Sequence, residues 1–238
     1  MEEEIKTIEE EIKKKKVVIG LPGNSFSSKF IVSWTSSLNT LWEMNKYDIV
    51  VSPGISSFVS FARMQTLGLS NLRGIDQKAF DGMDFDIFVT IDSDIVFTAQ
   101  NLINLIEATN EKDVVSGYYR MSDLKNLAIV KDWDINYLKK TGSFKYLQQE
   151  DIEKYKEEKY LSVAYCGMGF MALTKTAIDS LSYPYFHTEL QEFKGIDGKL
   201  IREICSEDVS FCRNLTKEGF EINVLPNLRV GHEKALII

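Results

Sequence analysis

The chain has 238 residues, of which 44% are hydrophobic and 26% charged, the composition of one large globular domain with a substantial core. Its formal net charge of −7 disfavours a broad nucleic-acid surface, because phosphate backbones are bound by a concentrated basic face. A small anionic ligand is compatible with this charge, since a few backbone N–H groups or a divalent ion can hold it.

The first 16 residues form a segment of their own. The run MEEEIKTIEEEIKKKK spaces Ile5, Ile8 and Ile12 as on a helix, with glutamates first and lysines last, an order that suits the helix dipole. We expect a charged amino-terminal helix or tail at 1–16 and a single domain at 17–238. The alternative is a self-association helix or a basic tether, which we disfavour because three isoleucines are too few for a coiled coil.

Strands and helices alternate from residue 17 to residue 109. Three apolar strands are predicted at VVIGLP, YDIVVSPG and FDIFVTIDSD, and three amphipathic helices at 25–44, 56–67 and 98–109, the last with Thr98 as N-cap. This order favours βαβ units, and the continuous apolar strands indicate a sheet covered on both faces. We therefore predict an α/β fold with a mostly parallel central sheet flanked by helices. Its ligands should bind where GLPGN, VSPG and DSD converge at the carboxyl ends of the strands.

The second half of the chain is less regular. We expect a strand at DVVSGYYRM and then, over 122–159, a polar excursion from the core that is helical near 149–158. VAYCGMGFMALT predicts a strand pair or a strand with a glycine-rich bend, and a helix is predicted at 174–181. Asp197-Gly198 is typical of a hairpin turn. SEDVSFCRNLTKEGF reads as an amphipathic helix, and EINVLP as a last short strand.

Two acidic motifs and a histidine carry the candidate chemistry. The DSD motif at 92–94 closes an apolar strand, and such a carboxylate pair can hold Mg²⁺ or Mn²⁺ against a diphosphate. An acidic pair at 207–208 starts a helix, and His232 follows the last strand. Each has an ordinary alternative, because acids also cap helices or face solvent, and a lone histidine is more often a hydrogen-bonded residue.

Taken together, these motifs resemble the GT-A class of nucleotide-sugar glycosyltransferases, DxD-containing and family-2-like, over most of 17–234. VVIGLPGNSF resembles the first strand and nucleotide-contacting turn, FDIFVTIDSDIVF the DxD strand, and YCGMGFMALTKTAIDSL the acceptor-side glycine segment. SEDVSFCRNLTKEGFEINVLPNLRVGHEK is similar to the acidic catalytic helix, final strand and metal-binding histidine. SFARMQTLG is similar to the Ala-Arg helix that faces the donor, with Met64 where an asparagine is usual. The resemblance implies a Rossmann-like GT-A fold with an irregular acceptor-side excursion.

The resemblance also implies a donor site. The metal, Mn²⁺ or Mg²⁺, would neutralise charge on the leaving diphosphate, and its ligands would be Asp92, Asp94 and His232. The donor, a nucleoside-diphosphate sugar, would contact residues at the ends of the first three strands and on the second helix: Leu21, Pro22, Gly23, Ser52, Arg63, Asp92 and Ser93. Asp94 is the preferred metal ligand, whereas Asp92 could bind the donor ribose, the metal or both. Arg63 could instead form a surface salt bridge.

The catalytic and acceptor residues follow from the same resemblance. Asp208 is the candidate base that takes a proton from the acceptor hydroxyl in an inverting transfer, with Glu207 as the alternative. In a retaining transfer neither need be a base. Trp133 is a candidate platform for the acceptor sugar, and Gly167 and Gly169 would let the chain approach the acceptor closely, although a bend without a ligand also needs glycine. The acceptor would be a glycan, a lipid-linked molecule or a protein.

Other activities fit less well. A sugar nucleotidyltransferase would need a basic, glycine-rich loop near the amino terminus, where GLPGNSFSSK has only Lys29. A haloacid-dehalogenase-type phosphatase carries its acid pair after the first strand, whereas this pair lies in the middle of the chain. A non-catalytic nucleotide-sugar-binding module is the alternative outside enzymes, and retention of both acidic motifs and His232 argues against it.

The location of the protein is suggested by its cysteines and its hydropathy. Cys166, Cys205 and Cys212 fit no common zinc pattern and indicate buried thiols in a reducing compartment. We see no secretory signal and no apolar run of about 18 residues, the length that spans a membrane. We therefore expect a cytoplasmic, soluble protein that could still act on an acceptor at a membrane surface.

Overall fold

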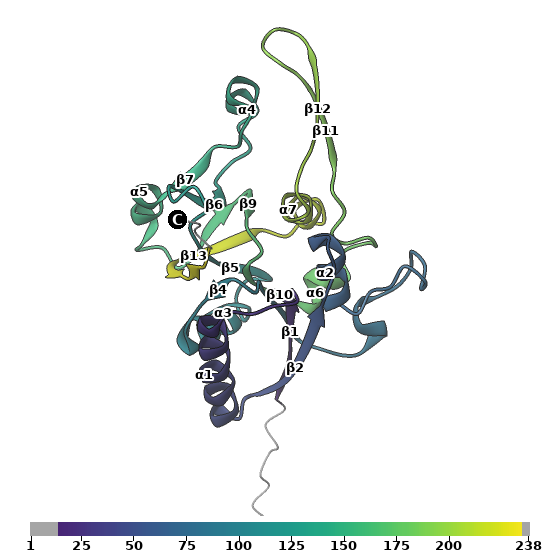
Figure 1. Cartoon of the computed structure of the whole chain (residues 1–238), viewed down its shortest axis with the longest axis vertical. Coiled ribbons are helices and arrows are strands. Elements are labelled where there is room, and N and C mark those ends of the chain that lie inside the picture. Colours follow the sequence, from purple (N-terminus) through teal and green to yellow (C-terminus); the bar gives the residue numbers. More distant parts are fainter. Residues whose placement is uncertain (1–13, 235–238) are drawn as a thin grey trace, which may run out of the picture.

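The computed structural model describes residues 14–234 and has a seven-stranded sheet at its centre (Figure 1). Its strands are β1 (Lys15–Pro22), β2 (Tyr47–Gly54), β3 (Ile87–Ile91), β5 (Val114–Tyr118), β8 (Leu161–Val163), β10 (Phe170–Thr174) and β13 (Ile222–Arg229). The order across the sheet is β2-β1-β3-β10-β5-β13-β8. Strands β2, β1, β3, β5 and β13 run in one direction, whereas β10 and β8 are antiparallel to their neighbours. The predicted α/β fold with a mostly parallel, Rossmann-like sheet is confirmed.

Helices cover both faces of this sheet. Helices α1 (Ser28–Met44) and α3 (Ala99–Ala108) pack on one face, and α2 (Val59–Thr66), α6 (Lys175–Asp179) and α7 (Glu207–Lys217) on the other. Alternate side chains of each strand enter opposite cores, as β1 shows: Val17 and Ile19 join the α1 side, and Val18 joins the α2 side. This double burial is why the central strand β3 is apolar along most of its length, whereas the edge strand β2 is largely exposed or half-buried.

Local signals place the helix ends. The Ser27 hydroxyl accepts a hydrogen bond from the Phe30 N–H and starts α1, while Asn45 ends it in the left-handed conformation with φ of 54°. The predicted Thr98 N-cap of α3 is confirmed, and Asn101 completes a capping box. Helices α1 and α2 each begin three residues later than predicted, since the residues before them are extended.

The prediction that residues 122–159 form an excursion from the core is partly wrong. The segment contains β6 (Asn126–Val130), α4 (Ile135–Thr141), β7 (Tyr146–Gln148), α5 (Gln149–Ile152) and the 3-10 turn η2 (Glu153–Tyr155). Strand β6 pairs with β7 and with β9 (Tyr165–Cys166) in a second sheet, and its apolar residues are buried in the two cores. This part of the segment therefore belongs to the core, whereas α4 buries no side chain and projects from it.

A β-hairpin projects from the same side of the molecule as α4 (Figure 1). It consists of β11 (Leu190–Lys194) and β12 (Leu200–Ile204), which pair only with each other within the described residues. The predicted turn at Asp197-Gly198 is confirmed, with Gly198 at φ of 78°. Two short strands, β4 (Ile95–Val96) and β14 (Gly231–His232), and the 3-10 turn η1 (Ala79–Gly82) complete the elements.

The remaining predictions concern the ends of the chain and the thiols. Residues 1–13 of the predicted amino-terminal helix or tail lie outside the described residues, and Lys15 and Lys16 belong to β1 rather than to that segment. All three cysteines are free and buried, as predicted. Between residues 14 and 234, the structure contains no helix with both the length and the apolar character needed to cross a bilayer.

Candidate active site

The ends of β1, β2 and β3 meet at the DSD motif, as the sequence predicts. Asp92 begins a tight turn in which its N–H donates to the Gly169 carbonyl at 2.9 Å and its own carbonyl accepts from the Ile95 N–H at 3.1 Å. Gly23, just after β1, has φ of 140°, and a Cβ built there would lie 2.9 Å from the Ser93 hydroxyl oxygen. Gly23 thus lets the β1 turn lie against the DSD turn.

The other donor-side residues lie along β1 and β2. Leu21 is buried and Pro22 is the last residue of β1. Ser52 does not end its strand, because β2 continues to Gly54 and Ser52 pairs with Gly20 in the register of the sheet. Strand β2 thus spans the whole of the predicted YDIVVSPG segment, and Ser52 suits it because the residue before a proline favours an extended backbone.

His232 lies beside Asp94 because two short strands pair. Strand β14 runs antiparallel to β4 with His232 opposite Ile95, and the Glu233 N–H donates to the Asp94 carbonyl at 2.8 Å. This pairing leaves His232 Nε2 3.2 Å from Asp94 Oδ2. The predicted proximity of the late histidine to the DSD motif is therefore present, and it arises from backbone pairing between segments far apart in the sequence.

Hydrogen bonds set the state of these two side chains. His232 Nδ1 lies 2.8 Å from the Arg120 carbonyl, and a carbonyl only accepts, so Nδ1 carries a proton. The other ring nitrogen, Nε2, faces Asp94 Oδ2. Lys234 Nζ lies 2.5 Å from the same oxygen. Burial raises the pKa of Asp94, but hydrogen bonds with His232 and Lys234 outweigh it and lower the pKa to about 2.

The spacing of this pair is compatible with a hard divalent cation, and Lys234 occupies Asp94 Oδ2 in this structure. Two cis ligands at octahedral Mg²⁺ or Mn²⁺ lie about 3 Å apart when each bond is about 2.1 Å, close to the separation found here. The Arg120 carbonyl orients the imidazole as backbone acceptors do at metal sites. Within residues 14–234, no three His, Cys, Asp or Glu side chains gather as a metal cluster, and Asp92 turns away from Asp94. The remaining ligands would have to be phosphate oxygens and water.

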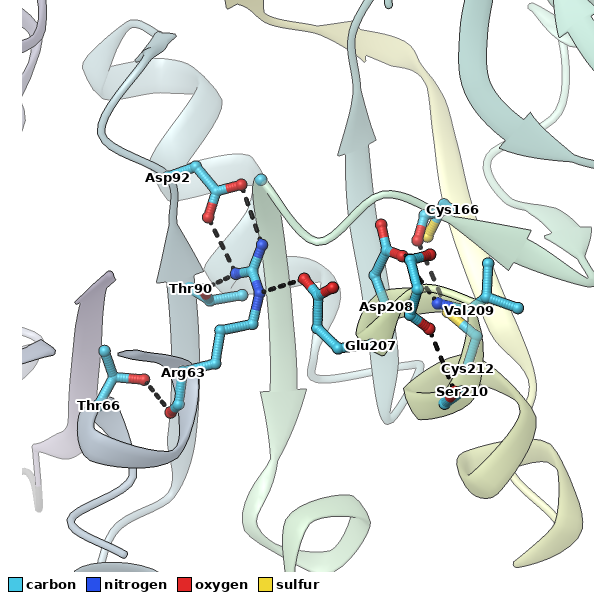
Figure 2. A network of polar contacts seen from close by, with 12 residues as sticks. Arg63, Thr66, Thr90, Asp92, Cys166, Glu207, Asp208, Val209, Ser210 and Cys212 are labelled. Carbon is cyan, nitrogen blue, oxygen red and sulfur yellow. Dashed lines mark hydrogen bonds and ion pairs between the residues drawn. The ribbon is translucent and has the colours of Figure 1, made fainter. Parts of the chain in front are cut away.

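Asp92 is held by Arg63 (Figure 2). The guanidinium contacts the carboxylate through two nitrogens, with Nη1 2.9 Å from Oδ1 and Nη2 3.0 Å from Oδ2. Its Nε lies 3.3 Å from Glu207 Oε1 and its Nη1 3.2 Å from the Thr90 hydroxyl. Arg63 is only 4% exposed, so the surface salt bridge considered from the sequence is instead a buried network. Every nitrogen of the guanidinium has a protein partner, so Arg63 is already engaged by Asp92, Glu207 and Thr90.

Glu207 and Asp208 lie at the start of α7 in different surroundings (Figure 2). Glu207 is 8% exposed, and burial together with the Asp208 charge raises its pKa, partly offset by Arg63. Asp208 is half-buried and accepts from the Tyr165 hydroxyl at 2.8 Å, from the Val209 N–H at 2.9 Å and from the Ser206 hydroxyl. Of the two acids, Asp208 is the one without a cationic partner among the described residues.

The residues predicted to bind the acceptor lie in different surroundings in the structure. Trp133 is 36% exposed and its ring lies 6.4 Å from that of Tyr165, the donor to Asp208. Gly167 and Gly169 lie against Tyr119, since a Cβ at Gly167 would be 2.3 Å from the Tyr119 hydroxyl and one at Gly169 2.9 Å from its ring. These glycines make room for a buried tyrosine, so the close approach predicted for an acceptor is taken by Tyr119.

A basic cavity of about 550 Å³ adjoins His232. Arg120, Arg229 and Lys234 line it, and its lining within residues 14–234 includes no carboxylate. Arg120 Nε is buried without a hydrogen-bond partner in that part of the chain. Sequence reasoning missed these cations and Tyr165. In the GHEK run, Lys234 lies two residues after His232 and could have indicated a cation beside the histidine. Arg120 is distant from His232 in the sequence, so no local pattern placed it in the same cavity.

No family model and no curated protein matches this chain. Among solved structures, the chain is similar to GalNAc-T7 with UDP, GalNAc and Mn²⁺, at 11% identity and a TM-score of 0.48, over 94% of this chain and 43% of that one. It is similar to glucosyl-3-phosphoglycerate synthase from Mycobacterium tuberculosis with Mn²⁺, uridine diphosphate and phosphoglyceric acid, at 13% identity and a TM-score of 0.46, over 94% and 72%.

A further similarity is to 4-diphosphocytidyl-2C-methyl-D-erythritol synthase from Anaerococcus prevotii, at 12% identity and a TM-score of 0.44, over 92% of this chain and 90% of that one. In the comparison with GalNAc-T7, this chain spans less than half the length of that protein. At such identities and scores the likenesses assign no substrate, metal or residue role to this chain.

Proposed function

We propose that this protein is a metal-dependent glycosyltransferase that moves a sugar from a nucleoside diphosphate to an acceptor hydroxyl. The observation that carries the proposal is the juxtaposition of Asp94 and His232, 3.2 Å apart at the carboxyl end of the parallel strands. Ligands of doubly wound sheets bind at this edge. Asp208 lies at the start of α7, the helix whose Glu207 is joined through Arg63 to the DSD turn.

Asp94 and His232 would hold a divalent ion, which would neutralise charge on the leaving diphosphate. Arg63 would act indirectly by holding the Asp92 carboxylate in one orientation, with Asp92 facing the donor rather than completing the metal shell. The turns at Leu21-Pro22-Gly23 and Ser93 would line the nucleoside. Arg120 and Arg229, which line the cavity beside His232, would add positive charge beside the diphosphate.

Asp208 would take the proton of the acceptor hydroxyl. A base needs an accessible carboxylate within hydrogen-bond reach of its substrate, and Asp208 is half-buried whereas Glu207 is committed to Arg63. Burial and the Asp208 charge raise the pKa of Tyr165, which keeps its hydroxyl protonated as a donor to Asp208. Tyr165 would thereby hold the carboxylate toward the acceptor, and Trp133 would offer an aromatic face to a sugar ring.

A sugar nucleotidyltransferase is less well supported. Such an enzyme needs cations at the loop after β1 to hold a triphosphate, and Lys29 is the candidate there. Lys29 Nζ lies 3.5 Å from Glu233 Oε1, so its charge already has a partner. The basic cavity lies instead at β14, beside the candidate metal ligands.

The decisive experiment measures nucleoside diphosphate release from a panel of nucleotide sugars with Mn²⁺, Mg²⁺ or EDTA. We expect metal-dependent release from at least one donor, lost by about 100-fold or more in Asp94→Ala and kept in the control Asp76→Ala, an exposed aspartate after α2. Asp208→Asn should keep donor release but lose transfer to the acceptor. Release that ignores EDTA, or pyrophosphate formation from a nucleoside triphosphate and a sugar phosphate, would contradict the proposal.

A further inference from the structure

A second cavity lies between the two elements that project from the core. It has a volume of about 470 Å³ and is enclosed by α4 with the following loop on one side and the β11–β12 hairpin on the other. Its apolar lining consists of Leu138, Phe144, Tyr146, Phe193, Ile201 and Ile204. The size is that of a small-molecule site.

Four of the residues that line this cavity have a polar group with a partner in the protein. Gln191 Oε1 accepts from Arg213 at 3.0 Å, Glu203 Oε1 from the Ile204 N–H at 2.9 Å, and the Ser143 N–H donates to Thr141 at 3.3 Å. The Cys205 thiol contacts the Ser210 hydroxyl at 3.1 Å. A sugar or a peptide backbone brings many donors and acceptors that need partners when buried. This lining therefore suits an occupant with few hydrogen-bonding groups.

Residues that line the cavity contact the candidate base and its neighbours. Ser206, which lines it, donates its hydroxyl hydrogen bond to Asp208. On the opposite wall, the Phe144 ring lies 5.2 Å from Trp133, and the Trp133 ring lies 6.4 Å from Tyr165, which donates to Asp208. Asp208 and Trp133 do not line the cavity themselves, but each contacts a residue that does.

Exposed apolar side chains also occur on the hairpin. Ile204, which lines the cavity, is 63% exposed, and Ile196 near the hairpin tip is 74% exposed. Leu190 and Leu200 belong to the face of the hairpin opposite Phe193 and Ile201, because alternate side chains of a strand point to opposite faces.

We propose that this cavity binds the hydrocarbon part of the acceptor, and that the acceptor is therefore an amphiphile with its hydroxyl head at Asp208 and its chain between α4 and the hairpin. The inference rests on the proposed function, because it assigns an acceptor class to that same site. Lys139, the cation in the lining, would remain near the polar end of the chain. A lipid-like chain fits better than a peptide since it leaves no hydrogen-bonding group unpaired.

Binding is measured first, by titrating the protein with octyl and methyl β-glucoside below the micelle concentration and following tryptophan fluorescence. Seven additional methylenes entering an apolar site should tighten binding of the octyl compound by about tenfold or more. Ile201→Asp, or Ile204→Asp if the first variant folds poorly, should reduce this preference to near unity. Leu72→Asp, at a position 91% exposed and remote from the cavity, should keep it.

Turnover is then compared for paired acceptors that share a sugar head and differ only in an octyl or methyl aglycone, with donor release measured in the same preparation. We expect a kcat/KM ratio of about tenfold or more in favour of the octyl acceptor, lost in Ile201→Asp. Equal use of both acceptors with intact donor release, or preference for an apolar peptide acceptor, would overturn the inference and leave the proposed function standing. Absent donor release would overturn the proposed function instead.

Discussion

Arg63 is the residue that joins the DSD turn to the start of α7. A buried guanidinium needs compensation for lost hydration, and here it has two carboxylates, Asp92 and Glu207. Burial lowers the pKa of Arg63, but Asp92 and then Glu207 outweigh this and raise it above the ordinary value. The group therefore stays charged, and its planar fork fixes Asp92 through two contacts. An ammonium group could not hold both oxygens in the same way.

Removing Arg63 should destabilise the fold strongly. Arg63→Leu leaves Asp92 and Glu207 without their cation, and breaking a buried pair costs about 3–5 kcal/mol. The measurement is the free energy of unfolding from urea titration. The control is Lys112→Met, whose partner Glu221 is 62% exposed and which should cost below about 1 kcal/mol. Comparable losses in both variants would show that the Arg63 network contributes no more than a surface pair.

At the scale of an element, the bend between β9 and β10 is packed around Tyr119. The tyrosine hydroxyl accepts from the Gly169 N–H at 3.1 Å, and the ring lies 4.7 Å from that of His232. Gly167 follows β9, and Gly169 precedes β10 and donates to Tyr119. The glycines therefore matter for where His232 sits, through the tyrosine that fills the space beside them.

Gly167→Ala should cost about 1–3 kcal/mol, because its Cβ would lie 2.3 Å from the Tyr119 hydroxyl oxygen. Tyr119→Phe removes that atom, so the double variant should recover about 1 kcal/mol relative to the sum of the single changes. A double-mutant cycle of urea unfolding measures this coupling. Additive losses would mean that the backbone near Gly167, rather than Tyr119, forbids a side chain.

Elements with short-range signals were predictable, and those fixed by distant contacts were not. The Thr98 cap and the Asp197-Gly198 turn depend on a few neighbouring residues, and both are confirmed. The partners of Arg63 lie 29 and 144 positions away in the sequence, so its burial is invisible to any local pattern. Strand β6 was missed because four apolar residues, Leu127 to Val130, stand between polar stretches and show no distinguishing period.

For the whole molecule, the fold divides into a packed sheet with its helices and two projections, α4 and the hairpin (Figure 1). The donor-side motifs are on the sheet, where burial holds them, and so the DSD edge could be inferred from strand order alone. The apolar cavity lies between the projections. No sequence window reveals it, because one wall ends at Tyr146 and the other begins at Gln191, and these segments meet only through the fold.

The hairpin should be removable without loss of the core. Gln191 faces Glu203 in register, so residues 192–202 can be replaced by an Asn-Gly turn. The removed residues pair only among themselves as strands in the described chain, and most of them are exposed. We therefore expect the free energy of unfolding to change by less than about 1 kcal/mol.

The control is Leu215→Ala, at a fully buried position on α7. It should lower the free energy of unfolding by about 2–5 kcal/mol in the same urea titration, which shows how large a loss the measurement detects. A hairpin deletion as costly as Leu215→Ala would show that the hairpin belongs to the cooperative core. A projection that only contacts a ligand should instead be dispensable for stability.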